Sequence, residues 1–375
     1  MKKVIQLQLV PTESQAESLT QTMRRFNAAC DWLAGRAYER RLANRYALQK
    51  LYYGEIRDRF GLKAQQACLV CAAVAGAYKR DKNKRVHFRP DAAMPFDARL
   101  WRPLNMSEVS LTTLDGRITM PFKMGSYQAD QWADLRMYAK LVRRKDGKWF
   151  LLACVESTDE DPSHPDDFLG IDLGVENIST DSDGEIHTSE AVEAVRKKRM
   201  ALTQQLQAKA SKKPNAKARK ALRRKLKRVG DCESRFRKHT NHCLSKQLVV
   251  KAKDTDRGIA LEDLKGIHDR IRFRKPQRAK TRSWSFAQLR DFIAYKAQEA
   301  GVFLALVNPR NTSRTCHECG HCEKANRRWQ AEFRCRQCGH KNHADVNAAL
   351  NIRATATCKR AELLDASPCY QAAAG

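Results

Sequence analysis

The chain has 375 residues, of which 71 are Lys or Arg and 42 are Asp or Glu, so its formal net charge at pH 7 is +29. This length is enough for two or three domains with hydrophobic cores of their own. The excess of positive charge favours a polyanionic partner over a merely solvated basic surface, because each phosphate that a cationic side chain neutralises releases a counterion.

The composition argues against export and against a membrane protein. The opening residues, MKKVIQLQLVPTESQ, alternate polar and apolar side chains and do not resemble a secretory signal. No apolar run approaches the roughly 20 residues that a bilayer span requires, so we expect no membrane partner. Thirteen cysteines in such a chain indicate metal binding in a reducing cytoplasm rather than disulfides. Nucleic acid is therefore the expected partner.

The first half is predicted to be a small β-barrel with a helical domain inserted in it. Residues 4–10 alternate like a strand, and Thr12 with Gln15 can form a capping box for the helix that follows. Two Asp-Gly pairs, in LTTLDGRITM and KLVRRKDGKWFLLACVE, lie between alternating segments, which is the strongest short-range signal for a hairpin. The predicted ranges are 1–11 and 85–156 for the barrel and 12–84 for the helices.

A second domain is predicted after the acidic, proline-containing linker at residues 157–167. Its elements are expected in this order: the strands FLGIDLG, ENIST and EIHT, a basic helical segment at 190–253, the strand GIALEDL, a helix at 283–300, the strand VFLALV and a last helix. This is the order of an RNase H-like α/β nuclease domain. We assign it to residues 168–353 and treat 354–375 as a C-terminal tail.

The helical segment of this domain carries a one-sign charge block. Residues 196–228 contain 15 Lys or Arg and no acidic residue. Such a block is often just a solvated face, but like charges repel one another, and we favour a contact with a phosphate backbone. Together with the basic loop at 270–282, the predicted nucleic-acid-binding residues are Arg196, Lys197, Lys198, Arg199, Arg223, Arg224, Lys225, Lys227, Arg228, Arg272, Arg274 and Lys275.

Two CxxC pairs separated by fifteen residues predict a zinc site. They are Cys316 with Cys319 and Cys335 with Cys338, and a glycine follows each pair. Four thiolates at this spacing can surround Zn²⁺ tetrahedrally, whereas a redox dithiol would not account for two matched pairs. The neighbouring Cys322, His321 and His340 are alternative ligands. We place this zinc ribbon at residues 312–342.

Three acidic residues lie beside apolar residues on predicted elements of the second domain. Asp172 follows Leu169, Gly170 and Ile171 on one strand, Glu262 lies near the end of another, and Asp345 opens a helix. Acids rarely occupy such positions unless they are paired or coordinate a cation, and converging carboxylates make an oxygen site for Mg²⁺ or Mn²⁺. A lone Asp at a helix start is more often an N-cap. The three together, in a basic chain, favour a two-metal site for phosphodiester hydrolysis.

At these residues the chain resembles the TnpB family, the transposon-encoded RNA-guided DNA nucleases related to type V CRISPR effectors. The segments GIDLGVEN, IALEDLKG, TSRTCHECG, FRCRQCG and HADVNAALNI are similar to its split RuvC nuclease motifs and zinc ribbon, in the family's order. In the first half, QLQLVPTESQ and AQQACLVCAAVAGAYK resemble its wedge-like barrel strand and its recognition-domain helices.

The resemblance implies specific roles and partners. Asp172, Glu262 and Asp345 would be the RuvC catalytic acids, and Cys316, Cys319, Cys335 and Cys338 would bind structural zinc. It further implies a guide RNA made from the transposon end, a double-stranded DNA target with a short adjacent motif, and a place in the prokaryotic cytosol or nucleoid. The oligomeric state stays open.

Three other functions stay open at this point. One is a nuclease-silent RNA-guided DNA-binding repressor, which the complete set of acids disfavours. Another is a transposase or integrase with an RNase H-like site, which would join strands as well as cut them. The third is a structural zinc-ribbon protein, which leaves the three acids unexplained. For the nuclease, we expect the ordered ribbon to fix where the last helix begins, and so where Asp345 points.

Overall fold

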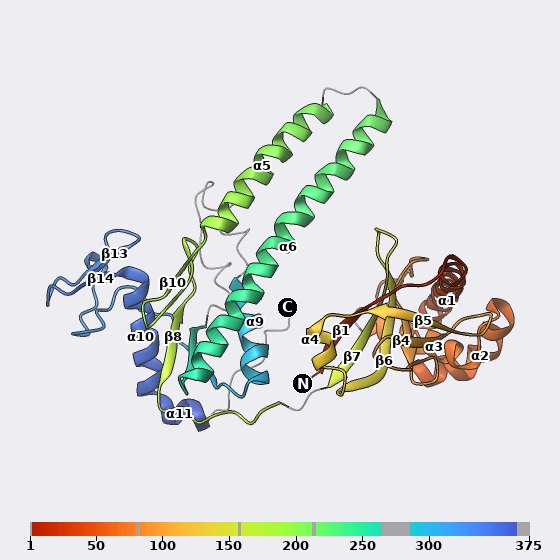
Figure 1. The fold of residues 1–375 in the computed structure, drawn as a ribbon, viewed down its shortest axis with the longest axis horizontal. Coiled ribbons are helices and arrows are strands. Elements are labelled where there is room, and N and C mark those ends of the chain that lie inside the picture. The colour runs from red at the N-terminus through yellow and green to blue at the C-terminus, as the bar shows by residue number, and fades with distance from the viewer. Residues whose placement is uncertain are drawn as a thin grey trace. The chain divides into compact units, whose positions relative to one another are not determined.

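The computed structural model describes residues 2–79, 81, 83–156, 159–211, 215–263 and 286–365, without the side chains of 227–231 and 365. The chain divides into two compact units, residues 1–158 and 159–375, each with its own sheet and hydrophobic core (Figure 1). The boundary falls at the start of the acidic segment 157–167. Among the described helices, none combines the length and the apolar composition that crossing a bilayer would need.

The first unit is a curled antiparallel sheet with three helices inserted after its first strand. Its elements are β1 (Lys2–Leu9), α1 (Glu13–Glu39), α2 (Arg45–Phe60), α3 (Ala64–Tyr78), β2 (Met94–Asp97), β3 (Trp101–Pro103), β4 (Glu108–Thr112), β5 (Arg117–Lys123), α4 (Ser126–Asp130), β6 (Leu135–Arg143) and β7 (Trp149–Glu156). The strand order is β2-β6-β7-β1-β5-β4-β3. Because β3 also contacts β6, the sheet curls into a barrel-like form.

Local sequence signals account for this unit. In the predicted capping box, the Thr12 N–H donates to Gln15 Oε1 at 3.0 Å and the Gln15 N–H donates to Thr12 Oγ1 at 3.3 Å. Both Asp-Gly pairs close hairpins, β4–β5 and β6–β7, with Gly116 at φ 144° and Gly147 at φ 86°. L-residues rarely adopt such angles, which is why glycine stands there. The hairpin predictions are confirmed.

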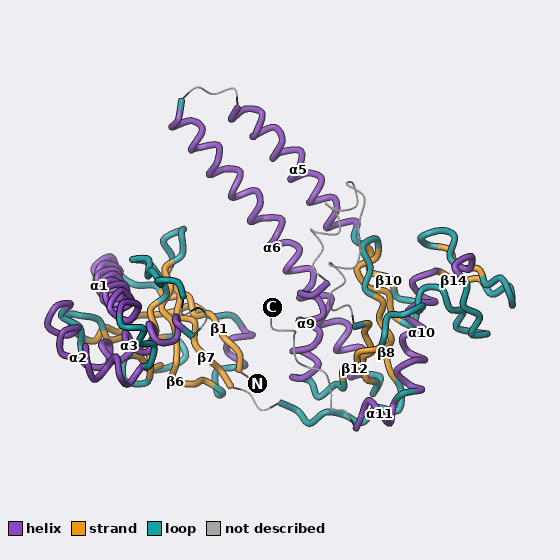
Figure 2. Tube along the Cα trace, turned by 180° about the vertical axis from the view of Figure 1, so that it is seen from behind, coloured by secondary structure: helices purple, strands orange, loops and turns teal. Residues whose placement is uncertain are grey.

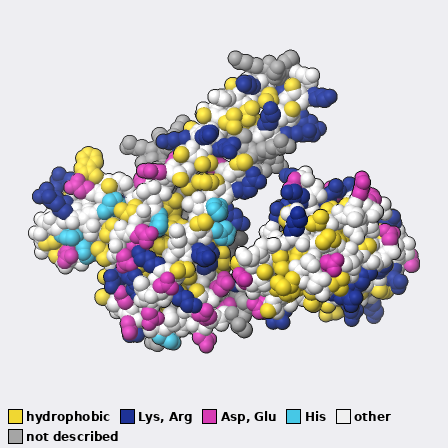
Figure 3. Space-filling view, in the orientation of Figure 1, with side chains coloured by type: hydrophobic (Ala, Val, Ile, Leu, Met, Phe, Trp, Pro, Cys, Tyr) yellow, Lys and Arg dark blue, Asp and Glu magenta, His cyan; other side chains and the backbone are white. Residues whose placement is uncertain are grey.

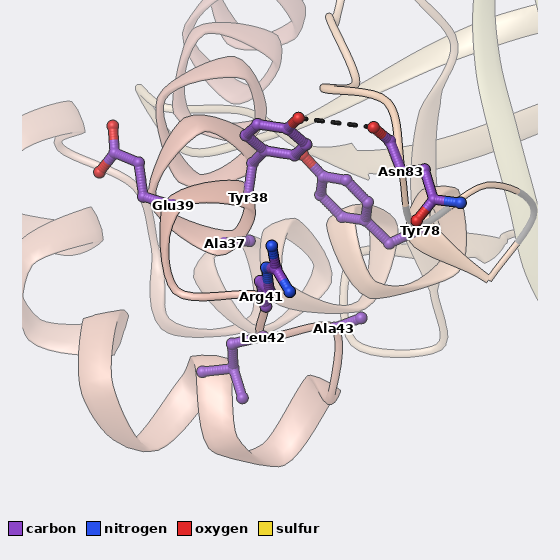
Figure 4. A pocket seen from close by; sticks show the side chains of 8 residues that line it. All are labelled: Ala37, Tyr38, Glu39, Arg41, Leu42, Ala43, Tyr78 and Asn83. Carbon is purple, nitrogen blue, oxygen red and sulfur yellow. Dashed lines mark hydrogen bonds between the residues drawn. The ribbon is translucent and has the colours of Figure 1, made fainter.

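A cavity of about 560 Å³ lies at the C-terminal end of α1 (Figure 4). The hydroxyl of Tyr38 donates to the carbonyl of Asn83 at 3.4 Å, and that of Tyr78 donates to the carbonyl of Ala34 at 2.8 Å. Both tyrosine tips are therefore tied to backbone. None of the site residues predicted from the sequence lines this cavity.

The second unit contains a mixed five-stranded sheet. Its strands are β8 (Phe168–Asp172), β9 (Asn177–Asp181), β10 (Ile186–Thr188), β11 (Gly258–Glu262) and β12 (Leu304–Val307), in the order β10-β9-β8-β11-β12. The strands β8, β9 and β10 pair antiparallel, whereas β11 pairs parallel with both β8 and β12. The order of strands and helices along the chain is the one that the sequence predicted.

Helices cover both faces of this sheet (Figures 1 and 2). They are α5 (Glu190–Ser211), α6 (Ala216–Asp254), α9 (Phe286–Glu299), α10 (Ala344–Cys358) and α11 (Arg360–Asp365). Leu169 and Leu261 face the C-terminal half of α6 and α9, while Phe168 and Ala260 face α10. Since side chains alternate along a strand, Asp172 and Glu262 belong to the face covered by α10.

The end of this unit differs from the predicted domain end at residue 353. Helix α10 continues to Cys358, and α11 follows it where a tail at 354–375 was expected. The physical reason is packing, because Ala356 is fully buried and Leu363 and Leu364 pack against the same cluster as Phe168. Residues 366–375 lie outside the described residues.

Candidate metal sites and nucleic-acid surface

Two of the three predicted acids end neighbouring parallel strands. Asp172 is the last residue of β8 and Glu262 the last residue of β11. The register pairs Leu261 with Ile171, so the two acids are the next residues of adjacent strands and point to the same face of the sheet. Neighbouring strands lie about 4.8 Å apart, so the two carboxylates share one sheet edge.

The third acid reaches this edge because α10 packs directly on β8. A Cβ added to Gly170 would lie 2.2 Å from the Ala349 carbonyl oxygen, so only glycine permits this approach of strand and helix. Ala349 and Ile352 are fully buried on the helix face that carries Asp345. The N-cap of α10 is His343, not Asp345. The N-cap interpretation of Asp345 is therefore wrong.

Asp172 is buried and lies within reach of the charges of both other acids. Burial, followed by the charges of Glu262 and Asp345, raises the pKa of Asp172 to about 8, against the opposing effect of the Arg327 guanidinium. Burial also raises the pKa of Glu262, although the Thr312 hydroxyl donates to its carboxylate and lowers it. A divalent cation would relieve this concentration of acidic groups.

Two side chains hold Asp345, which is 5% exposed. Asn177 Nδ2 donates to its Oδ2 at 2.8 Å, and Arg327 Nη2 donates to its Oδ1 at 2.7 Å. The three acids are nevertheless not gathered as tightly as a closed metal site. In the described part of the chain, groups of three or more potential metal ligands within 4.8 Å of one another occur only at the two places in the ribbon described below.

Four cysteines form the first of these groups. Cys316, Cys319, Cys335 and Cys338 bring their sulfur atoms within 4.8 Å of one another. The Cys316–Cys338 and Cys319–Cys335 sulfur distances are 3.7 and 3.5 Å. With Zn–S bonds of about 2.3 Å, the edge of a tetrahedral site is about 3.8 Å, so the group fits a zinc ion. Cys322, His321 and His340 are outside this group.

The two cysteine pairs have the same backbone geometry. The Gly320 N–H donates to the Cys316 carbonyl at 2.9 Å, and the Gly339 N–H donates to the Cys335 carbonyl at 3.2 Å. Both glycines have positive φ, 73° and 74°. The glycine after each pair thus closes the turn beneath the sulfurs.

The ribbon is attached to α10 by side chains that the sequence analysis missed. Asn347 Nδ2 donates to the Thr315 carbonyl at 2.8 Å, and Asn351 Nδ2 donates to the carbonyls of Thr312 and Thr315 at 2.8 and 2.7 Å. The two asparagines are four positions apart and so lie on one helix face. The two asparagines in the otherwise apolar stretch VNAALNI were the signal that could have revealed them.

The predicted nucleic-acid-binding residues of 196–228 lie on α5 and α6, which pair as a long helical arm. Lys197, Lys198, Arg223, Arg224 and Lys225 are exposed and Arg199 is half-buried, and Lys and Arg side chains are spaced along the arm in Figure 3. The side chains of Lys227 and Arg228 lie outside the described residues, as do Arg272, Arg274 and Lys275 of the basic loop. The nucleic-acid role of these residues stays a prediction.

Arg196 differs from the rest of this set. Its side chain is 17% exposed, and its Nη2 donates to the Glu193 carboxylate at 2.8 Å. The hydrogen bonds that Arg196 donates to the Glu193 carboxylate raise the pKa of Arg196. Arg196 is therefore engaged within its own helix, because Glu193 lies one turn earlier on the same face.

The ribbon also presents an exposed aromatic side chain that the sequence analysis did not select. Trp329 is 71% exposed. It lines a cavity of about 160 Å³ together with Arg328, Arg334, Arg336 and one acid, Glu332. An indole ring among guanidinium groups is the combination on which unpaired bases stack.

Two family models match the second half of the chain. A model described as "Probable transposase" (OrfB_IS605) matches residues 152–265, which include Asp172 and Glu262. A model described as "Cas12f1-like, TNB domain" matches residues 286–352, which include the four cysteines and Asp345.

Curated proteins that are similar to this chain are named as DNA endonucleases or as TnpB-like proteins. The CRISPR-associated endodeoxyribonuclease Cas12f1 of Sulfoacidibacillus thermotolerans is 40% identical over 34% of this chain and 29% of its own length. The putative RNA-guided DNA endonuclease InsQ of Escherichia coli is 28% identical over 57% of this chain and 55% of its own. The TnpB-like protein MJ0751 of Methanocaldococcus jannaschii is 28% identical over 51% of this chain and 69% of its own. The chain thus spans less than two thirds of the Cas12f1 and InsQ proteins.

The fold is also similar to a solved structure. The match is to the cryo-EM structure of the Cas12f1-sgRNA-target DNA complex, with a TM-score of 0.61 and 14% identity, over 89% of this chain and 82% of that one. At this identity the likeness concerns the fold alone.

Proposed function

The chain is a relative of the TnpB-like proteins and of Cas12f1, as its motifs predicted, and from this premise we propose that it is an RNA-guided DNA endonuclease of a transposable element. The second unit would be a RuvC-like nuclease domain with an inserted zinc ribbon. The observation that carries the proposal is the meeting of Asp172, Glu262 and Asp345 at one sheet edge, in a chain of net charge +29.

The three acids fit a site for Mg²⁺ or Mn²⁺, since they are hard oxygen ligands whose mutual repulsion a divalent cation offsets. Two such ions, when bound, supply an activated water and stabilisation of the leaving oxygen. We assign the most direct ligation to Asp172 and Asp345. Glu262, oriented by the hydroxyl of Thr312, completes the site and helps to orient the attacking water.

Asn177 and Arg327 serve as positioning residues for Asp345. Asn177 fixes one carboxylate oxygen and Arg327 the other, at 2.8 and 2.7 Å. The guanidinium of Arg327 also places a positive charge beside the acids, where a scissile phosphate would carry negative charge.

The ribbon would hold structural zinc at its four cysteines and set the start of α10. A ribbon of this size has too little hydrophobic core to fold alone, so metal binding supplies its folding energy. The hydrogen bonds from Asn347 and Asn351 to the ribbon backbone, and the Arg327–Asp345 pair, transmit that order to the third acid.

The nucleic-acid contacts are assigned to the exposed cations of the α5–α6 arm and to Trp329. In RNA-guided systems, base pairing reads the target while the protein holds the heteroduplex by its backbone. Changing Arg223, Arg224 and Lys225 together to Ala should weaken nucleic-acid binding. The salt slope of log K should fall by up to about 2.7, or about 0.9 for each phosphate that is no longer neutralised. An unchanged slope would refute this assignment.

The function is tested in two steps with the full-length protein. RNA that copurifies from cells is sequenced, and the complex is then assayed for Mg²⁺-dependent cleavage of DNA that carries the matching sequence. We expect cleavage by the wild type and only background cleavage by Asp172→Ala. Asp166→Ala is the matched control, because the side chain of Asp166 is 95% exposed.

Each alternative function has its own outcome in this assay. Equal cleavage by the wild type and Asp172→Ala would remove the nuclease site from consideration. Tight RNA-dependent DNA binding without nicking by the wild type would indicate the repressor. Joined strands, rather than cut ends, would indicate the integrase.

A further inference from the structure

We propose that the ribbon binds a second divalent metal ion, at His317, Glu318 and His340. These residues lie beside the four cysteines in sequence but form a separate group with no member in common. They play no part in the function proposed above. The ion would be of the kind that two imidazoles and a carboxylate hold, for which Zn²⁺ is the common occupant.

The geometry brings one donor atom from each residue together. One ring nitrogen of each histidine and one carboxylate oxygen of Glu318 lie within 4.8 Å of one another. The rings of His317 and His340 meet edge to face with their centroids 4.7 Å apart, and His317 Nε2 lies 3.1 Å from Glu318 Oε1. Three protein ligands with one open position is the arrangement of zinc sites that keep a bound water.

The hydrogen bonds of Asn347 determine which nitrogen of His317 is available. Asn347 Nδ2 donates to the Thr315 carbonyl at 2.8 Å, so its Oδ1 is the atom that faces His317. That oxygen lies 3.3 Å from His317 Nδ1, and an acceptor there requires the proton on Nδ1. The neutral ring then presents the lone pair of Nε2 to the Glu318 carboxylate.

Two acceptors 3.1 Å apart repel each other unless a cation or a proton lies between them. Histidine metal ligands commonly donate their other ring N–H to an oxygen acceptor, which orients the ring, and Asn347 performs this for His317. The proton alternative, an imidazolium paired with Glu318, is the rival that the experiment must separate from the metal.

His340 adds an unpartnered nitrogen. Its Nε2 is buried and has no hydrogen-bond partner among the described residues. A buried imidazole nitrogen without a partner is costly, so its presence next to another histidine and a carboxylate points to a ligand.

The neighbouring cysteines favour a cation electrostatically. If the four thiolates hold Zn²⁺ as proposed, that centre carries a net charge of −2, and Glu318 adds another negative charge nearby. A second divalent ion at the two histidines would offset much of this charge.

The site can be titrated in full-length protein that keeps zinc at its cysteines. Co²⁺ is the probe, because a nitrogen and oxygen environment gives it weak visible bands without the intense thiolate charge-transfer bands of a cysteine site. Every arm carries Asp172→Ala and excess Mg²⁺, so that the acids do not contribute. Zinc and cobalt per chain are measured by mass spectrometry after desalting.

The expected result is one zinc and one cobalt per chain. His317→Ala and His340→Ala should each weaken cobalt binding at least about 100-fold, and Glu318→Gln at least about 10-fold. His321→Ala is the matched control, since His321 is a ribbon histidine that also faces a carboxylate, Glu323 at 3.3 Å, but is outside the group. It should bind cobalt like its parent.

Zinc content reports whether each variant keeps a folded ribbon. Should a histidine variant lose the cysteine zinc, Glu318→Gln decides the matter, because the Glu318 side chain is 58% exposed and its replacement does not disturb packing. Absence of bound cobalt, or cobalt binding that these three changes leave intact, would overturn the proposal in favour of the imidazolium pair. Neither result bears on DNA cleavage, so the proposed function stands or falls separately.

Discussion

The cysteine site and the acid site are assembled from very different lengths of chain. Cys316 and Cys338 are 22 positions apart, whereas Asp172 and Asp345 differ by 173 positions in the numbering. The sulfur atoms gather within 4.8 Å through two short turns of the same geometry. The acids depend instead on the register of β8 with β11 and on the seating of α10.

The two sites should therefore fail for different reasons. The cysteine site needs its own turns and its metal, while the acid site needs an intact domain core and the ribbon as well. Asn347, Asn351 and Arg327 link the two sites, because their side chains join the ribbon to α10 and to Asp345. Substitutions in each region test this distinction.

The largest effect is expected from Cys335→Ser. Loss of one thiolate should release zinc, disorder the ribbon and reduce DNA cleavage to background, because Asp345 then loses its support. Zinc content and cleavage are measured on the same preparation. Cys322→Ser is the control, as Cys322 is exposed and outside the four-cysteine group. A zinc-free Cys335→Ser that cut DNA normally would disprove the coupling.

Gly170→Ala should damage the acid site and spare the cysteine site. The new Cβ would meet the Ala349 carbonyl at 2.2 Å and push α10 away from β8. Overpacking of this kind should lower the free energy of unfolding by about 2–3 kcal/mol and weaken Mg²⁺ binding. Denaturant unfolding and zinc content are the measurements. Gly76→Ala is the control, because nothing lies within 4 Å of the added Cβ, and it should be neutral or stabilising. Loss of zinc from Gly170→Ala would contradict the separation of the two sites.

Arg327→Ala should have a smaller effect that depends on Mg²⁺. Removing the guanidinium leaves Asp345 buried without its cationic partner, which should cost about 1–2 kcal/mol of stability without added Mg²⁺. Saturating Mg²⁺ should reduce this loss, because a bound cation replaces the missing charge. The exposed Arg328 supplies the control, Arg328→Ala. A loss of stability that Mg²⁺ does not alter would show that Arg327 acts on something other than the acids.

The smallest effect concerns the pH dependence of Asp172. Burial, with the charges of Glu262 and Asp345, raises its pKa from 3.8 to about 8. Between these values the folded protein retains a proton that the unfolded chain has lost, so the stabilising contribution of Asp172 is present at low pH and falls as pH rises towards 8. Asp172→Asn cannot ionise and should melt a few degrees higher than the wild type at pH 8 without added Mg²⁺. Melting curves at pH 5 and 8 test this, and a difference that did not grow with pH would contradict it.

Sequence reasoning reached those parts of the molecule that local patterns specify. The matched CxxC pairs, the Asp-Gly hairpins and the order of strands were all visible as short motifs. The placement of Asp172 and Glu262 at strand ends followed from the apolar residues before them. These signals are local because turn chemistry and side-chain alternation are local.

The residues that complete the acid site were not visible in this way. Asn177 contacts Asp345 across 168 positions, and Thr312 contacts Glu262 across 50. Such pairs follow from tertiary packing, and a polar residue at a strand start or in a loop carries no mark of its distant partner. The same reason explains the misplaced domain end, since Ala356 looks like a tail residue until it is packed beside Phe168.

Among its described side chains, the α5–α6 arm is buried at one end only. In α5, whose residues are all described, Val192 near its start is the buried one, and along the described side chains of α6 burial begins at Asn241. Helical turns added to or removed from both helices in step would therefore lengthen or shorten the basic surface and leave the sheet untouched. The length of basic surface that can contact a polyanion and the chemistry of the acid site can therefore change independently, either in evolution or by engineering.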